Sequence, residues 1–158
     1  YNYRGGTLHQ GVELGLSGSQ RMGVGALDYR GSWTYSDFHF RAGEYAGKQI
    51  AGVPRHLINA ELMVRLGAWR FGPNLRWVPV STPTDHANTA GTQQESYALL
   101  GLKVEWSDGP WALYLQADNV TDRRYASSYV IRNQATAAQP GYLPGLGRSV
   151  TAGLTYKF

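Results

Sequence analysis

Apolar and polar residues alternate with a period of two along seven segments of this 158-residue chain. Such alternation is typical of β-strands whose two faces meet different surroundings, because successive side chains of a strand point to opposite sides. None of these segments keeps a helical period, so the pattern predicts an all-β protein. The seven predicted strands are 7–17, 24–36, 55–66, 69–80, 96–106, 111–120 and 148–158.

The connections between the predicted strands alternate between short and long. The short ones are 18–22, 67–68 and 107–110, and the long ones are 37–54, 81–95 and 121–147. Transmembrane β-barrels have this arrangement, because their periplasmic turns are short and their extracellular loops are long. The predicted strands also have about the 9–11 residues that a tilted strand needs to cross a bilayer. The predicted fold class is therefore an antiparallel, up-and-down transmembrane β-barrel segment.

Charged residues are absent from one face of the predicted strands, although they make up 16% of the chain. The opposite face carries Glu13, Asp28, Arg30, Glu61, Arg65, Arg70, Arg76, Lys103, Glu105, Asp118 and Lys157. Aromatic residues border the uncharged face, with Trp69, Phe71, Trp106, Trp111, Tyr156 and Phe158 toward the short connections and Trp33, Tyr35 and Trp77 toward the long ones. Two aromatic girdles around an aliphatic band are typical of a membrane-spanning barrel. The uncharged face is thus predicted to contact lipid.

Composition excludes several other classes of protein. The chain has no cysteine, which excludes disulfide scaffolds, cysteine-ligated zinc and thiol nucleophiles. Its 15 lysines and arginines are scattered, so we expect no nucleic-acid partner. No unbroken apolar run approaches the length of a membrane-spanning helix. The chain begins with Tyr1 and shows no signal peptide, so we expect a mature product or a piece of a longer protein.

Three stretches resemble segments of one protein family. They are Gly-Val-Glu-Leu-Gly-Leu at 11–16, Ala-Gly-Val-Pro-Arg-His-Leu at 51–57, and Asp-Asn-Val-Thr-Asp-Arg-Arg-Tyr-Ala at 118–126 followed by Pro-Gly-Leu-Gly-Arg-Ser at 144–149. The last predicted strand then alternates up to Phe158, as in bacterial outer-membrane barrels. Together these stretches resemble the C-terminal third of TonB-dependent outer-membrane receptors, and the last combination is the most specific.

This resemblance implies a receptor of the bacterial outer membrane, with a 22-stranded barrel filled by an N-terminal plug. Such receptors import metal chelates, most often ferric siderophores, with energy passed through TonB. Residues 1–158 would supply about seven of the strands, as the C-terminal part of the barrel without its plug, and alone would transport nothing. The implied partners are outer-membrane lipid, a ferric siderophore or other metal chelate, TonB through the plug, and the barrel-assembly machinery through the last strand. The resemblance implies neither an enzyme nor a bound cofactor.

Ligand contacts in such a receptor would come from the long predicted loops. The candidates are Arg41, Tyr45, His86, Tyr129, Arg132 and Tyr142. Arginine with tyrosine suits an anionic, aromatic chelate, because guanidinium groups pair with carboxylate or catecholate oxygens and stack on rings. For any single residue, ordinary loop polarity is the simpler explanation. The adjacent pair Asp85 and His86 does not make a metal site, and no spacing indicates catalytic residues.

A second set of residues lies in the family-like motif and is predicted to be structural. These residues are Asn119, Asp122, Arg123, Tyr125, Gly147, Arg148 and Phe158. We expect Arg123, Arg124 and Arg148 to hydrogen-bond to carbonyl groups of the loops and of the inner wall.

Two other classes of protein stay open at this point. A complete small outer-membrane barrel with a structural or adhesion role would match the chain length, but its interior must be packed with side chains. The predicted inner face is instead rich in glycine and short polar residues. A soluble β-sandwich that binds carbohydrate through its tryptophans would also have one uncharged face. The placement of the aromatic residues at two borders favours the membrane over the sandwich.

Overall fold

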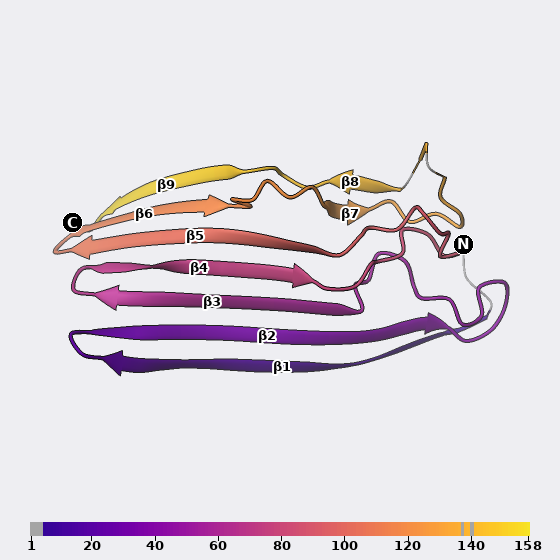
Figure 1. Cartoon of the computed structure of the whole chain (residues 1–158), viewed down its shortest axis with the longest axis horizontal. Coiled ribbons are helices and arrows are strands. Elements are labelled where there is room, and N and C mark those ends of the chain that lie inside the picture. Colours follow the sequence, from indigo (N-terminus) through magenta and orange to yellow (C-terminus); the bar gives the residue numbers. More distant parts are fainter. Residues whose placement is uncertain (1–4, 137, 140) are drawn as a thin grey trace.

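The computed structural model describes residues 5–136, 138–139 and 141–158, which form nine β-strands (Figure 1). The strands are β1 (Thr7–Met22), β2 (Gly25–Phe40), β3 (His56–Leu66), β4 (Trp69–Val78), β5 (Tyr97–Asp108), β6 (Trp111–Asp118), β7 (Ala126–Tyr129), β8 (Tyr142–Pro144) and β9 (Ser149–Tyr156). Seven strands form one antiparallel sheet in the order β1-β2-β3-β4-β5-β6-β9, and β7 pairs with β8 in a separate hairpin. The all-β, up-and-down arrangement of seven strands is confirmed. The described residues contain no helix that is long and apolar enough to span a membrane.

The large sheet is open within the described part of the chain. Its two edges are β1 and β9, and the described strands do not close it into a barrel. In Figure 1 the three short turns lie at one end of the sheet, near the C-terminus, and the long connections gather at the other end. The alternation of short and long connections therefore separates the molecule into a turn end and a loop end.

Strand pairing places the residues of the uncharged face in continuous rows. One row runs from Leu14 to Trp33, then to Ile58 and Trp77, across β1–β4. The large apolar side chains of this face are exposed, and they include Leu14, Leu16, Leu62, Trp69, Phe71, Trp77, Leu102, Trp111, Leu113, Leu115, Val150 and Leu154. A contiguous apolar surface of this extent needs an apolar partner. In a transmembrane barrel that partner is the lipid.

Aromatic rings border this face at both ends, as the sequence predicts. Toward the turn end, the ring centres of Trp69 and Trp106 lie 6.5 Å apart. Toward the loop end, the Trp33 ring stacks on His56, and its Nε1 donates a hydrogen bond of 3.2 Å to His56 Nδ1. Amphipathic rings of this kind suit the two interfaces of a bilayer.

Ion pairs run across the strands on the opposite, inner face. They join residues of neighbouring strands and leave most of these side chains partly exposed. The pairs are Arg30–Glu61 (3.0 Å), Asp28–Arg65 (2.8 Å), Arg70–Glu105 (3.1 Å) and, within β5, Lys103–Glu105 (2.6 Å). The charges that are missing from the apolar face are thus gathered, mostly paired, on the inner face.

The first hairpin is longer than the sequence predicts. β1 ends at Met22 rather than at 17, so the first turn consists of Gly23 and Val24 instead of 18–22. Gly23 has a φ of 57°, which suits the first central position of a type II′ turn. β2 continues to Phe40 rather than to 36. Main-chain hydrogen bonds extend both strands past the apolar band, where the alternation on which the prediction depended has ended. The other predicted strand ends shift by one or two residues.

The sequence predicted that the last long connection is a loop throughout, but it contains a short hairpin. β7 and β8 pair within it, with Tyr129 opposite Tyr142. In Figure 1 this hairpin continues the line of β6 and β9 beyond the sheet. The two strands have 4 and 3 residues, which is too short for an alternation to be visible.

Candidate functional site

The three long connections pack against one another at the loop end. We call them loop A (41–55), loop B (79–96) and loop C (119–148, which includes β7 and β8). Loop A contacts loop B through the main-chain N–H of Gly52, which donates to the carbonyl of Pro83 at 2.8 Å. The side chain of Asn88 adds two bonds to Gln49, accepting from its N–H (2.8 Å) and donating to its carbonyl (2.9 Å). Loops A and B are therefore bonded as two strands of a sheet would be.

Asp85 of loop B bonds to loop C and has no exposed surface. Its carboxylate accepts hydrogen bonds from the main-chain N–H groups of Thr89 (2.9 Å) and Ala135 (2.7 Å), and from the Thr89 hydroxyl. Burial by itself raises the pKa of Asp85, but these bonds and a further one involving Asn88 outweigh it and hold the pKa below its ordinary 3.8. Asp85 is therefore a buried, charged side chain that joins loops B and C.

His86 fills the interior of the loop layer. Its ring centre lies 5.0 Å from that of Phe40, edge to face, and 5.9 Å from that of Tyr45. Burial lowers the pKa of His86, and the neighbouring charge of Asp85 opposes this only in part. Its Nδ1 is buried and has no hydrogen-bond partner among the described residues. The neutral ring thus acts as a packing element of the layer.

Asn119 and Asp122 hold the base of loop C. The Asn119 side chain accepts from the N–H of Arg123 (2.8 Å) and donates to the carbonyls of Arg123 (2.9 Å) and Leu146 (3.1 Å). Asp122 accepts from the main-chain N–H of Arg148 at 3.1 Å, and the Arg148 guanidinium lies 3.7 Å from its carboxylate. The two ends of loop C are therefore bonded together above β6 and β9.

Neighbouring residues join this base to the sheet. The Arg123 guanidinium donates to the carbonyl of Ser96 at 3.1 Å, just before β5. The ring of Tyr125 lies 5.3 Å from that of the buried Tyr97. Gly145 lies so close under the Tyr125 ring that a Cβ atom there would overlap it. A glycine at this position is thus required by the approach of the ring.

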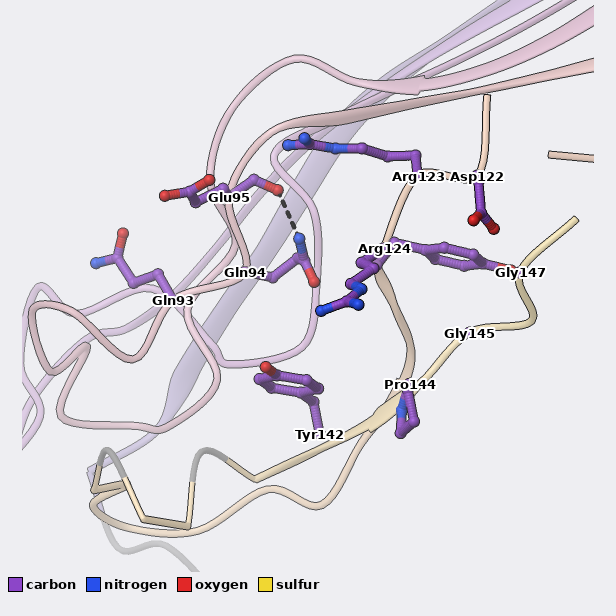
Figure 2. A pocket seen from close by; sticks show the side chains of 11 residues that line it. Gln93, Gln94, Glu95, Asp122, Arg123, Arg124, Tyr142, Pro144, Gly145 and Gly147 are labelled. Carbon is purple, nitrogen blue, oxygen red and sulfur yellow. Dashed lines mark hydrogen bonds between the residues drawn. The ribbon is translucent and has the colours of Figure 1, made fainter. Parts of the chain in front are cut away.

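A cleft of about 650 Å³ lies between loop B and the base of loop C (Figure 2). It is lined by Gln93, Gln94, Glu95, Asp122, Arg123, Arg124, Tyr125, Tyr142, Pro144, Gly145 and Gly147. Figure 2 shows Arg124 reaching between Gln94 and Tyr142, whereas Arg123 lies apart from it and extends toward loop B near Glu95. Arg124 forms no hydrogen bond or ion pair with any described residue. The cleft therefore holds an unpaired cation beside a phenol ring and side-chain amides, which suits an anionic ligand with flat or aromatic groups.

The six candidate ligand residues do not form one site. Only Tyr142 among them lines the cleft. Tyr45 is buried beside His86 inside the layer. Arg41 is exposed at the start of loop A, where its main-chain N–H donates to the Gly6 carbonyl at 3.1 Å.

The remaining two candidates lie in loop C. Arg132 is exposed, and its Nη1 donates to Gln139 Oε1 at 2.6 Å. Tyr129 is half-buried beside Gly52 of loop A, and burial chiefly raises its pKa to about 12. A phenol with this pKa stays neutral at any physiological pH. The roles of all six residues as ligand contacts stay predictions.

Two functional features escaped the sequence prediction. Arg124 is predicted to be structural, yet it lies free in the cleft, and the buried position of Asp85 between two loops is not predicted. No local signal separates Arg124 from Arg123, which bonds to Ser96, because the two residues are adjacent and identical in type. No local signal marks Asp85, because its partner Ala135 lies in another loop. In the described part of the chain, no three His, Asp or Glu side chains are placed to hold a metal ion.

An open antiparallel sheet with an apolar outer face, a charged inner face and long loops at one end defines a wall of a transmembrane β-barrel. Comparison with known families agrees with this class. The family model for the TonB dependent receptor-like beta-barrel matches residues 1–120. The chain belongs to this family. Residues 121–158 lie beyond the matched region, so their resemblance to the family rests on the sequence motif.

Comparison with solved structures gives the same fold. The ferric yersiniabactin uptake receptor FyuA from Yersinia pestis is similar with a TM-score of 0.70 and 23% identity. The match covers 96% of this chain and 24% of the FyuA chain, so this chain spans about a quarter of that receptor's length. No curated protein sequence matches significantly.

Family membership places the chain in the outer membrane of Gram-negative bacteria, in a family of receptors rather than enzymes. Neither the small complete barrel nor the soluble sandwich gains support from these comparisons.

Proposed function

We propose that residues 1–158 are the C-terminal part of a receptor barrel that takes up a metal chelate of the ferric siderophore class across the outer membrane. The observation that carries this proposal is the unpaired Arg124 beside Tyr142, in a cleft of a chain that belongs to a receptor family. FyuA, a ferric yersiniabactin uptake receptor, supports the choice of ligand class. The open edges at β1 and β9 support the proposal that further strands complete the barrel.

The chemistry of the cleft fits this ligand class. A guanidinium forms paired hydrogen bonds with carboxylate or catecholate oxygens and stacks on planar rings. Tyr142 is 39% exposed and offers a ring face and a hydroxyl group to the same ligand. Gln93 and Gln94 add amide groups on the opposite wall. An unpaired guanidinium, a phenol ring and two amides therefore converge on a single ligand-sized space, which the charged Glu95, Asp122 and Arg123 also line.

The remaining partners follow from the same proposal. The apolar face would contact outer-membrane lipid. TonB would act through a plug that lies outside these residues. The terminal strand β9, with the exposed Phe158 after it, would be the segment that engages the barrel-assembly machinery.

The test uses the full-length receptor in its own bacterium. A strain lacking the receptor gene is grown under iron limitation with single ferric chelates of the catecholate, hydroxamate and phenolate classes, and with haem and cobalamin as non-siderophore arms. We expect growth on one ferric siderophore class to depend on the receptor. Dependence on haem or cobalamin alone would replace the siderophore with that ligand, and dependence on no chelate would overturn the proposal.

Variants then test the cleft. Arg124→Gln should weaken uptake by about tenfold or more, because a charge-assisted hydrogen bond contributes roughly 1.5–3 kcal/mol. The matched control is Arg21→Gln, at the turn end of β1 and far from the cleft, which should leave uptake unchanged. Equal uptake by the two variants would exclude Arg124 from the binding site.

A further inference from the structure

Loop B bonds to both of its neighbours within one short stretch, residues 83–89, and to loop C again at Gln94 and Ser96. We infer that Asp85 is a positioning residue that holds loops B and C in the geometry of the cleft, and that Asn88 separately holds loop A to loop B. These two connections between the loops go beyond the proposed function, and only their effect on ligand affinity rests on that function.

The contacts between loops B and C surround Asp85. Its carboxylate receives the N–H of Ala135, which is 2% exposed. On the main chain, the N–H groups of His86 and Ala87 donate to the carbonyls of Arg132 and Asn133, both at 3.1 Å. Asp85 itself forms a parallel bridge with Arg132. A buried carboxylate therefore anchors the point at which loop C runs beside loop B.

The contacts between loops A and B use different atoms of the same stretch. The side chain of Asn88 pairs with both main-chain groups of Gln49, and the carbonyl of Pro83 accepts from Gly52. Asn88 has a φ of 52°, a left-handed conformation that asparagine adopts more readily than most residues. One seven-residue stretch thus carries both connections, one on each side, and the Asn88 side chain also donates to the Asp85 carbonyl at 3.1 Å.

A buried chain of bonds leads from Asp85 to the cleft. The adjacent Thr84 is also fully buried, and its hydroxyl donates to the carbonyl of Thr92 at 2.8 Å. Residues 93–95 follow directly and form the loop B wall of the cleft. Gln94 in turn accepts the N–H of Ala126 in loop C at 2.7 Å. Movement of Asp85 relative to Ala135 would therefore change the separation of the two cleft walls.

The test measures distances between loops and requires no ligand. The chain has no cysteine, so cysteine pairs introduced into the full-length receptor can carry spin labels on this part of it. Three exposed or partly exposed pairs serve: Lys48 with Ala90 for loops A and B, Ala90 with Gln134 for loops B and C, and Glu95 with Leu146 across the cleft. Pulsed electron paramagnetic resonance in outer-membrane vesicles then gives each distance distribution, with the unlabelled receptor as background.

We expect three narrow distributions in the receptor that is otherwise unchanged. Asp85→Ala should broaden the 90–134 and 95–146 distributions and leave 48–90 narrow. Asn88→Ala should do the reverse, broadening 48–90 alone. The matched control is Thr89→Val. It deletes the hydrogen bond from the Thr89 hydroxyl to the Asp85 carboxylate, which joins two residues of loop B, and it should leave all three distributions narrow.

A 95–146 distribution that stays narrow in Asp85→Ala would overturn the positioning role, as would equal broadening of all three pairs by either variant. If the Asp85→Ala receptor does not reach the membrane, the near-isosteric Asp85→Asn is used instead. It should also broaden the 90–134 and 95–146 distributions and leave 48–90 narrow. Hydrogen exchange adds a measurement that needs no variant. The Ala135 amide should exchange slowly in the unmodified receptor, and fast exchange there would also overturn the inference. Because no arm contains a chelate, these results stand whether or not the proposed ligand class is correct.

Discussion

In the sheet, neighbouring strands share rows of similar apolar residues, whereas the loop layer depends on a few buried polar side chains. The row from Leu14 to Trp77 is exposed at both of its ends and half-buried at Trp33 and Ile58, and similar apolar residues recur along every strand. Thr82, Thr84 and Asp85 have no exposed surface and occur once each. The sheet is thus specified by a repeated pattern that tolerates conservative changes, and the loop layer by single residues without substitutes.

The sheet and the loop layer also differ in how far their charged side chains are exposed. Ion pairs on the inner face of the sheet remain partly exposed, and the Arg30 side chain keeps 72% of its accessible surface. The charge of Asp85 is enclosed and bonded from three directions. Removing a partner costs little where water can replace it and much where it cannot.

The largest effect is expected from a charge on the lipid face. Leu115→Arg in β6 should destabilise the full-length receptor by about 2–4 kcal/mol, because the guanidinium would enter the hydrocarbon. The neighbouring Gln116 points to the inner face, so Gln116→Arg should cost far less. Urea unfolding in lipid vesicles, followed by tryptophan fluorescence, measures both variants. Equal destabilisation would mean that the assignment of the two faces is wrong.

The next effect concerns the base of loop C. Asn119→Ala removes three side-chain hydrogen bonds of a residue that is 6% exposed. The backbone of Asn119 has a φ of 48°, in the left-handed region. We expect a local loss of about 1–3 kcal/mol and faster hydrogen exchange at the Arg123 amide. Asn119→Gly separates the two causes, because it permits the left-handed backbone and lacks only the side-chain bonds. A variant with native exchange at Arg123 would show that the side chain does not hold this base.

A pH effect should be confined to the loop layer. Burial lowers the pKa of His86 from its ordinary 6.5, so the folded layer favours the neutral ring. Its stabilising contribution is complete above about pH 6.5 and is lost as the pH falls below that value toward the lowered pKa of the folded protein. The pKa of Asp85 is held below 3.8, so that residue contributes to acid loosening only below this pH.

Limited proteolysis of loops A–C between pH 7.5 and pH 4.5 measures this effect. Cleavage should increase as the pH falls, while the strands stay resistant. His86→Phe keeps an aromatic ring against Phe40 and cannot be protonated, so its cleavage should not depend on pH in this range. The same pH dependence in this variant would assign the effect to another group.

The smallest effect is expected on the inner face of the sheet. Arg30→Ala breaks a pair with Glu61 that water can replace, and should cost about 0.2–1 kcal/mol. Added salt should reduce the difference further, because it screens exposed charges. Urea unfolding at low and high ionic strength measures it. A loss as large as that of Asn119→Ala would contradict the contrast between the sheet and the loop layer.

Sequence reasoning succeeded in the sheet because each strand repeats the same signal. The unlike faces, the aromatic borders and the two-residue turn at Gly67 could all be read from alternation and connection length. It failed at Met22 and Phe40, where main-chain pairing continues without alternation. It also missed the β7–β8 hairpin, whose strands are too short to carry a period.

The candidate site was less predictable for the same reason. Tyr45 and Tyr142 are both tyrosines of long loops, and nothing in their neighbours along the chain separates the buried ring from the one in the cleft. Arg123 and Arg124 are likewise adjacent and identical in type. In the folded loops, Arg123 donates to the Ser96 carbonyl, whereas Arg124 lies in the cleft without a partner among the described residues.

By itself, the sequence determined the number of strands in the large sheet, the face that is apolar and the end at which the long loops gather. These properties depend on residues that are close along the chain, since period and turn length are local quantities. Only the tertiary structure decided that Asp85 meets Ala135, that Asn88 pairs with Gln49 and that Arg124 lies free in a cleft. Those contacts join loops that lie 39 or more residues apart, and they form because buried polar groups need partners that only the folded loop layer brings within reach.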